Sequence, residues 1–317
     1  MKKRFITLIL AFGLACSLSQ AVLCAANTPS DHSAERSPEE IALRTAAAKG
    51  DQDAMYALAV ALIEPIAPEA GPIKEGKEAA ELLEKCVEVG SADAAFLLGY
   101  MHQYATGVER DIPAALSWLK KAADMGNDSA LVTLGTIYRK GDGVVRDRIK
   151  ARDYYAKAAQ QDNLNAMTSL GLMYMDGDGV HRDGKLAQNW LRRAASRGHA
   201  PAMVALGKLY ASKDLSVLNG PKAIYWTHKA IGQGHLPGVY ALGILYRDGV
   251  GSIQPDAYTA YLWLGLTFEL AEDTGEVPYW FENAARVLTP EQRKKADAEL
   301  DRWLKNGPPS PPAKEPE

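Results

Sequence analysis

The sequence predicts an all-α protein, an α-solenoid of stacked antiparallel helix pairs, on three observations. Leu-Gly dipeptides recur at a constant spacing, aromatic residues and paired alanines keep the same spacing, and each unit holds two apolar stripes of helical period. The dipeptides stand 36 residues apart, at Leu98-Gly99, Leu134-Gly135, Leu170-Gly171, Leu206-Gly207 and Leu242-Gly243. Such a period is typical of repeat units that bury their apolar faces against their neighbours.

Two aromatic series support the same period. The first contains Tyr138, Tyr174, Tyr210 and Tyr246, with His102 in the first slot, and the second contains Trp118, Tyr154, Trp190 and Trp226. In residues 163–198 the first apolar stripe includes Leu170 and the second includes Trp190, and a turn separates them. Gly171 costs about 0.5–1 kcal/mol relative to alanine inside a helix. Its return in five units therefore predicts a close contact between the paired helices.

The turn in this unit reads Asp176-Gly177-Asp178-Gly179, which raises the question of a calcium loop. An EF-hand loop that begins at Asp176 would have His181 in place of the required glycine and Ala187 in place of the bidentate glutamate. Corresponding turns in other units keep their glycines and change their acids. The sequence therefore predicts a turn with glycines at positive φ, and no metal site.

The N-terminal segment has the layout of a secretory signal. Basic residues precede an apolar run from Phe5 to Leu18, and small residues follow. We expect cleavage after Ala21, with Ala25 or Ala26 as the alternative. Removal of residues 1–21 takes three of the 36 basic residues, so 33 remain against 39 acidic residues, a net charge of −6. We therefore expect a periplasmic or secreted protein with no span in the mature chain and no nucleic-acid partner.

The predicted domain organisation follows from signals at the two ends. Residues 22–36 form a disordered leader, and a helical repeat domain extends over residues 37–306. Ser37-Pro38-Glu39-Glu40 begins an N-terminal capping helix over 38–49, and Thr289-Pro290-Glu291-Gln292 begins a closing helix that extends to about Lys305. Residues 307–317 form a proline-rich disordered tail.

Cysteine is sparse in this chain. Cys16 is lost with the signal, Cys24 remains only with the earlier cleavage site, and Cys86 lies in an apolar helical context. A buried free Cys86 is the main expectation. A Cys24–Cys86 disulfide stays open as an alternative in an oxidising compartment.

The repeats resemble those of the Sel-one-like repeat family, a short-period relative of the tetratricopeptide repeat. The resemblance depends on residues 129–161 (SALVTLGTIYRKGDGVVRDRIKARDYYAKAAQQ) and 165–198 (NAMTSLGLMYMDGDGVHRDGKLAQNWLRRAASRG). It covers roughly residues 51–270, and the closing helix is similar to that of bacterial secreted members. The resemblance implies an α-solenoid and a role in protein interaction. Residues 63–77 and 211–221 depart from the pattern.

The candidate partner site is a stripe on the first helix of each unit, at positions that vary between units. These positions are more apolar than a solvated face requires, which favours a groove for a peptide or partner helix. The alternative is that part of the stripe packs against the neighbouring unit. The candidate residues are Phe96, Tyr100, Arg139, Leu172, Met175, Lys208, Tyr240, Ile244 and Arg247.

No catalytic pattern is present in the sequence. His-Glu-x-x-His, a nucleophile elbow and a phosphate loop are all missing, and the histidines do not cluster at metal spacing. We therefore expect a non-catalytic scaffold or regulator, a monomer without cofactor or metal, that binds an unidentified protein or peptide. Two alternatives stay open: an enzyme or binder of β-lactam-like or peptidoglycan fragments, and a secreted host-contact factor.

Overall fold

The computed structural model describes residues 37–271 and 275–316, so the predicted signal peptide, its cleavage sites and the leader lie outside the described residues. In this part of the chain the fold is all-α, as predicted, with fifteen α-helices and a single isolated β-bridge between Val250 and Ile253. Among the same residues, the helices are all too short or too polar to cross a membrane.

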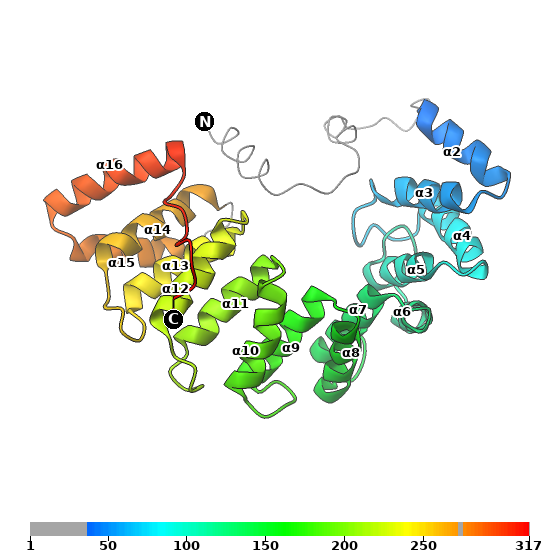
Figure 1. Ribbon diagram of the computed structural model, residues 1–317. Coiled ribbons are helices and arrows are strands. Elements are labelled where there is room, and N and C mark those ends of the chain that lie inside the picture. Colours follow the sequence, from blue (N-terminus) through cyan, green and yellow to red (C-terminus); the bar gives the residue numbers. More distant parts are fainter. Residues whose placement is uncertain (1–36, 272–274, 317) are drawn as a thin grey trace. The chain divides into compact units, whose positions relative to one another are not determined.

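Within the described residues the chain divides into two compact units, residues 37–163 (the N-unit) and residues 164–271 with 275–316 (the C-unit). In the N-unit, α2 packs on α3, and the next helices form the pairs α3 with α4, α5 with α6 and α7 with α8 (Figure 1). Its helices are α2 (Pro38–Ala48), α3 (Gln52–Ile63), α4 (Lys74–Glu88), α5 (Ala92–Tyr104), α6 (Ile112–Asp124), α7 (Asp128–Lys140) and α8 (Arg148–Gln160).

The C-unit continues the same pattern, with α9 paired with α10, α11 with α12 and α13 with α14. Two further helices follow, and both α15 and α16 pack against α14. Its helices are α9 (Leu164–Asp176), α10 (Gly184–Ala195), α11 (Ala200–Ala211), α12 (Gly220–Ile231), α13 (Leu236–Asp248), α14 (Ala257–Leu270), α15 (Val277–Val287) and α16 (Pro290–Asn306).

The recurring helical glycine provides the close contact that the sequence predicts. A Cβ atom placed on Gly171 would lie 2.5 Å from Cγ of Leu191 on the second helix of the same pair. The same test on Gly135 puts the Cβ 2.7 Å from the ring of Tyr155. The first helix therefore tolerates a residue of low helix propensity because the second helix inserts a large side chain there.

The turn at residues 176–179 has the predicted backbone. Gly177 and Gly179 adopt φ of +74° and +77°, in the left-handed region that favours glycine. The amide of Asp178 donates to the carbonyl of Met173 at 3.0 Å, and the guanidinium of Arg182 donates to the carbonyl of Met175 at 3.0 Å. Backbone geometry thus accounts for these glycines.

From α6 onward each second helix begins with a side-chain cap, and successive caps lie 36 residues apart, except that Asn219 and Asp256 lie 37 apart. The carboxylate of Asp183 accepts from the amides of Lys185 and Leu186, both at 2.9 Å, and the amide of Asp183 donates to the carbonyl of Tyr174 at 2.9 Å. The residues that cap the second helices in this way are Asp111, Asp147, Asp183, Asn219 and Asp256. Every helix pair from α5 onward therefore closes its turn in the same manner.

The predicted capping helix appears as α2, and the predicted closing helix appears as α16 with its capping box at Thr289 and Gln292. The sequence did not predict α15. Cys86 is buried, and burial raises the pKa of its thiol, while Cys24 lies outside the described residues. Residues 307–316, which we expected to be disordered, lie along the surface of the C-unit.

Candidate partner-binding surfaces

Two surfaces of the helix pairs are candidates for binding, one on the first helices and one on the second helices. On the first, eight of the nine predicted residues are half-buried and Lys208 is exposed. In the N-unit these are Phe96 and Tyr100 on α5 and Arg139 on α7. The C-unit carries the other six, Leu172 and Met175 on α9, Lys208 on α11, and Tyr240, Ile244 and Arg247 on α13. All nine therefore keep some solvent access in the part of the chain described.

Other positions of the same stripe are buried. Gln103 is 5%, Thr168 7% and Val204 7% exposed. The hydroxyl of Thr168 lies 2.9 Å from Nδ1 of His199 at the start of α11. Part of the stripe thus packs within the repeat array, as the alternative interpretation expected, and the rest forms the candidate surface.

Two of the candidate residues have partners within the chain. The guanidinium of Arg247 donates to the carboxylate of Asp248 at 2.6 and 2.7 Å and lies 3.7 Å from the ring centroid of Trp280. The ring of Tyr100 lies 4.6 Å from that of Tyr104. Arg247 is therefore held by its neighbours in the C-unit, and the exposed ammonium of Lys208 is better placed to select an acidic partner.

The second helices carry a row of cations over aromatic rings, which we call the aromatic–cation ladder. In each step, the cation lies three residues after the aromatic residue on the same helix, above its ring. The pairs and their distances to the ring centroid are Trp118 with Lys121 (5.3 Å), Tyr154 with Lys157 (5.9 Å), Trp190 with Arg193 (4.8 Å) and Trp226 with Lys229 (5.0 Å). We predicted the aromatic series from the sequence, but not the cations that lie over its rings.

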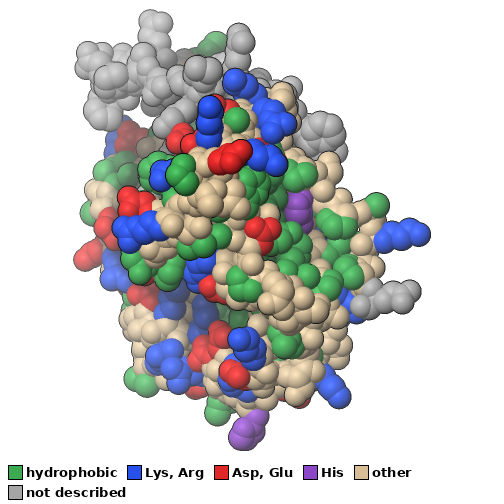
Figure 2. Space-filling model, turned by 90° about the vertical axis from the view of Figure 1, so that its left-hand side faces the viewer, with side chains coloured by type: hydrophobic (Ala, Val, Ile, Leu, Met, Phe, Trp, Pro, Cys, Tyr) green, Lys and Arg blue, Asp and Glu red, His purple; other side chains and the backbone are tan. Residues whose placement is uncertain are grey.

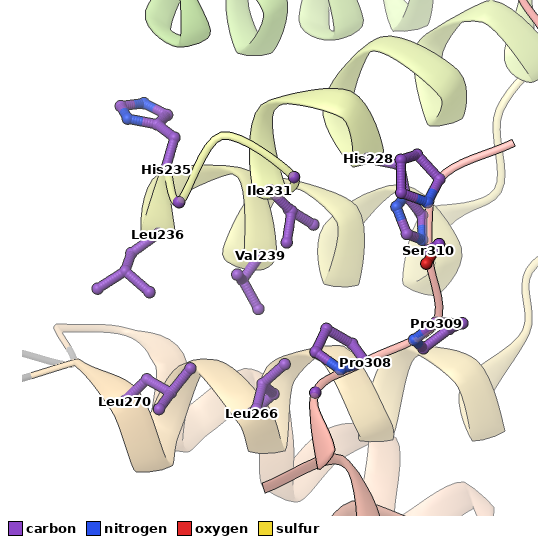
Figure 3. Close-up of a pocket in the computed structure, with 14 residues that line it drawn as sticks. His228, Ile231, His235, Leu236, Val239, Leu266, Leu270, Pro308, Pro309 and Ser310 are labelled. Carbon is purple, nitrogen blue, oxygen red and sulfur yellow. The ribbon is translucent and has the colours of Figure 1, made fainter. Parts of the chain in front are cut away.

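An apolar pocket of about 220 Å³ lies in the C-unit between α12, α13 and α14. Figure 3 shows Leu266 and Leu270 on α14 facing side chains from α12 and α13, while Pro308 and Pro309 cross at the end nearer His228. The remaining apolar lining comes from Ile231, Leu236, Val239 and Pro311. Sequence reasoning did not find this pocket, because its walls are far apart along the chain.

Burial changes the pKa values of three histidines in the C-unit. Desolvation lowers the pKa of His199, His228 and His235, and His235 adds a smaller repulsive contribution at His199. His199 and His235 are the N-cap residues of α11 and α13, which agrees with their predicted place in the turns between units. His228 is 7% exposed, and its ring meets that of Trp263 edge-on at 5.1 Å. All three favour the neutral form.

His102 fills the slot that holds tyrosine in the later units. Like Tyr174 and Tyr246, it is half-buried, and its Nδ1 lies 3.3 Å from the carbonyl oxygen of Glu109. Across residues 37–271 and 275–316, groups of three or more His, Cys, Asp or Glu suited to hold a metal are not found. On the face drawn in Figure 2, acidic and basic side chains are interspersed.

Consecutive helix pairs, with a buried glycine against the partner helix in each pair from α5 to α14, define a helical repeat protein of the α-solenoid class. The chain belongs to the Sel1 repeat family. The family model, described as Sel1 repeat, matches residues 92–127, 129–163, 164–199, 200–235 and 237–270. Proteins of this family are generally scaffolds for protein interaction and are typically non-catalytic.

The chain is also similar to several solved structures. A Sel1 repeat protein from Oxalobacter formigenes is 28% identical, with 74% of this chain and 95% of that chain covered and a TM-score of 0.60. A protective antigen present in uropathogenic Escherichia coli strains, displaying an SLR fold, is 25% identical, with 84% and 67% covered and a TM-score of 0.48. An immunity protein from Pseudomonas aeruginosa is 23% identical, with 81% and 88% covered and a TM-score of 0.43. No curated protein matches the chain.

Proposed function

We propose that this protein is a non-catalytic scaffold or regulator that acts in the periplasm or after secretion and binds a protein partner on the first helices of its repeats. The observation that carries the proposal is the character of the nine candidate residues. They are apolar or cationic, half-buried or exposed, and they vary from repeat to repeat while the helix pairs keep their buried contacts. Variation at accessible positions on a constant framework is what a recognition surface needs.

The chemistry of the surface indicates how a partner binds. Aromatic rings at Tyr100 and Tyr240 supply large contact areas at low entropic cost, as they do in other interfaces. Lys208 adds a positive charge beside the apolar side chains of the C-unit. A peptide or helix with apolar anchors and an acidic residue fits this combination.

The N-terminal segment supports the periplasmic or secreted location in this proposal. The basic residues, apolar run and small residues of the first 21 positions have the order of a signal peptide. Fractionation of cells into cytoplasm, periplasm and medium, followed by N-terminal sequencing of the mature chain, tests this part. A mature protein that begins at Val22 or after Ala25 or Ala26 supports it, and an uncleaved cytoplasmic chain contradicts it.

Crosslinking and capture from intact cells tests the binding surface. We expect the wild-type chain to capture a discrete partner, and Tyr100→Ala with Tyr240→Ala to abolish capture without lowering the melting temperature. Tyr279→Ala is the matched control, because Tyr279 on α15 is 61% exposed and is not one of the candidate residues. Loss of capture together with a lower melting temperature in the double variant would show that these tyrosines support the fold instead.

A further inference from the structure

The proline-rich segment, residues 307–316, lies against helices of the C-unit. Its prolines cross the apolar pocket, and Cγ of Pro311 comes within 3.7 Å of the Cβ position of Gly232 at the end of α12. Figure 3 shows Pro308, Pro309 and Ser310 passing close to α14 and His228. The segment therefore occupies a surface built from α12, α13 and α14.

Glu315 fixes the far end of this segment. Nη2 of Arg192 on α10 donates to Oε2 of Glu315 at 2.7 Å, and Nε1 of Trp226 on α12 donates to Oε1 at 3.1 Å. The Glu315 side chain is 20% exposed and that of Arg192 is 47% exposed. Both carboxylate oxygens are thus bound by donors on two different helices, 123 and 89 residues away in the sequence. A charge-assisted pair of this kind recognises a carboxylate specifically.

The burial of Trp226 indicates that the segment covers this step of the aromatic–cation ladder. Trp118, Tyr154 and Trp190 are half-buried, whereas Trp226 is 4% exposed. The guanidinium of Arg192 lies 6.0 Å from the Trp226 ring centroid. One repeat earlier, Ala156 stands at the position equivalent to Arg192. The indole N–H and the guanidinium come together as a carboxylate clamp at this step of the ladder.

We propose that the apolar pocket and the carboxylate clamp of Arg192 and Trp226 form a binding site for proline-rich peptides that carry an acidic residue. The proline-rich segment of the chain itself is the resident occupant, and a partner segment of the same chemistry binds by displacing it. Prolines suit this role because an extended proline-rich peptide loses little conformational entropy on binding. The resident segment is tethered, so its effective concentration is high and even a weak site stays filled.

The interactions that hold the segment do not depend on the covalent connection. Proline rings form one wall of an apolar pocket, and a carboxylate meets two donors, so a free peptide with the same spacing makes the same contacts. The proposed site shares α13 with the first-helix surface but uses other residues, because Leu236 and Val239 line the pocket and are not among the nine candidate residues. Failure of this proposal would leave the proposed function of that surface unaffected.

A peptide titration tests the proposal. The probe is a fluorescein-labelled peptide of sequence GPPSPPAKEPE, which is residues 307–317, and the readout is its fluorescence anisotropy. The proteins are the full chain and a full-length release variant that carries Pro308→Ser, Pro309→Ser, Pro311→Ser and Glu315→Gln. We expect the release variant to bind the probe at least about tenfold more tightly than the wild-type chain, because its own segment competes less.

The clamp is tested in the release variant. Adding Arg192→Gln is expected to weaken probe binding about tenfold or more, whereas Arg193→Gln on the same helix leaves it unchanged, because Arg193 lies over Trp190 instead. A probe with glutamine in place of the glutamate equivalent to Glu315 should bind the unmodified release variant about tenfold more weakly. This comparison needs no further change in the protein, so it does not depend on how Arg192→Gln folds.

Several results would overturn the proposal. These are equal binding of the probe by wild type and release variant, absence of binding to both, or equal binding of the two probes. Gel filtration could give one further contradicting result. If the wild-type chain elutes as a dimer and the release variant as a monomer, the segment belongs to a second copy, and the idea of an internal occupant that a partner displaces is wrong.

Discussion

At Gly171 the absence of a side chain makes room for Leu191, whose Cγ would lie 2.5 Å from a Cβ atom on residue 171. A real Cβ does not approach another carbon so closely, so Gly171→Ala must push the two helices of the pair apart or force Leu191 from its rotamer. Overpacking of this kind costs about 1–3 kcal/mol, and the gain in helix propensity returns at most about 1 kcal/mol. We expect a net destabilisation, measured by urea denaturation.

A double-mutant cycle checks the cause of this effect. In a Leu191→Ala background, Gly171→Ala should cost much less, or become stabilising, because the atom it meets is gone. Additive effects of the two changes would contradict the contact as the reason for glycine. The sequence predicted this contact because the repeat returned glycine to one helical position five times.

Some contacts of single residues could not be predicted from the sequence. The clamp on Glu315 joins residues 123 positions apart, and neither Arg192 nor Glu315 is unusual in its local sequence. Arg247 looked like a free cation on its stripe, yet its neighbours Asp248 and Trp280 hold its guanidinium. Periodicity predicts which positions are equivalent, but it carries no information on contacts that occur in one repeat alone.

At the scale of elements, the second helix of each pair depends on its cap. Asp183 accepts two amide hydrogen bonds at the start of α10. We expect Asp183→Ala to lower the free energy of unfolding by about 1 kcal/mol, because these amides lose their acceptor, whereas Asp183→Asn keeps most of the stability. Thermal denaturation followed by circular dichroism measures the difference.

The control for the cap lies in the same connection between helices. Asp176 is exposed at the end of α9, where a negative charge opposes the helix dipole, so Asp176→Ala should leave stability unchanged or raise it slightly. Equal losses for Asp176→Ala and Asp183→Ala would contradict a specific cap. The capping residues recur close to the repeat period, so the sequence carries the signal for these caps as well as for the turns.

Helix α15 shows a different limit of sequence reasoning. It lies outside the repeat period, so no equivalent element supports its prediction, and its N-terminal residue Glu276 provides no side-chain cap. Tyr261 on α14 stacks on Phe281 of α15 with ring centroids 4.5 Å apart. Packing on α14 therefore specifies this helix more than its local sequence does.

At the scale of the whole molecule, we expect three histidines of the C-unit to make the two units respond differently to acid. His199, His228 and His235, whose pKa values burial lowers, all lie in the C-unit. A histidine with a lowered pKa in the folded state binds its proton more readily in the unfolded chain. Its contribution to stability is therefore complete above the ordinary pKa of about 6.5 and is lost as the pH falls through that value toward the folded pKa.

We expect acid to loosen the C-unit before the N-unit. Hydrogen exchange measured from neutral pH down to about pH 5, below the ordinary histidine pKa, should show falling protection in α12 and α13 while α6 and α7 change less. His228→Phe keeps a ring against Trp263 and removes one titrating group, so its C-unit should lose less stability over the same range. The shift at His228 is caused by burial rather than by a charged neighbour, so added salt should leave the difference between the units in place. Equal loss of protection in both units, or the same pH dependence in His228→Phe as in the wild-type chain, would show that these histidines do not control the response.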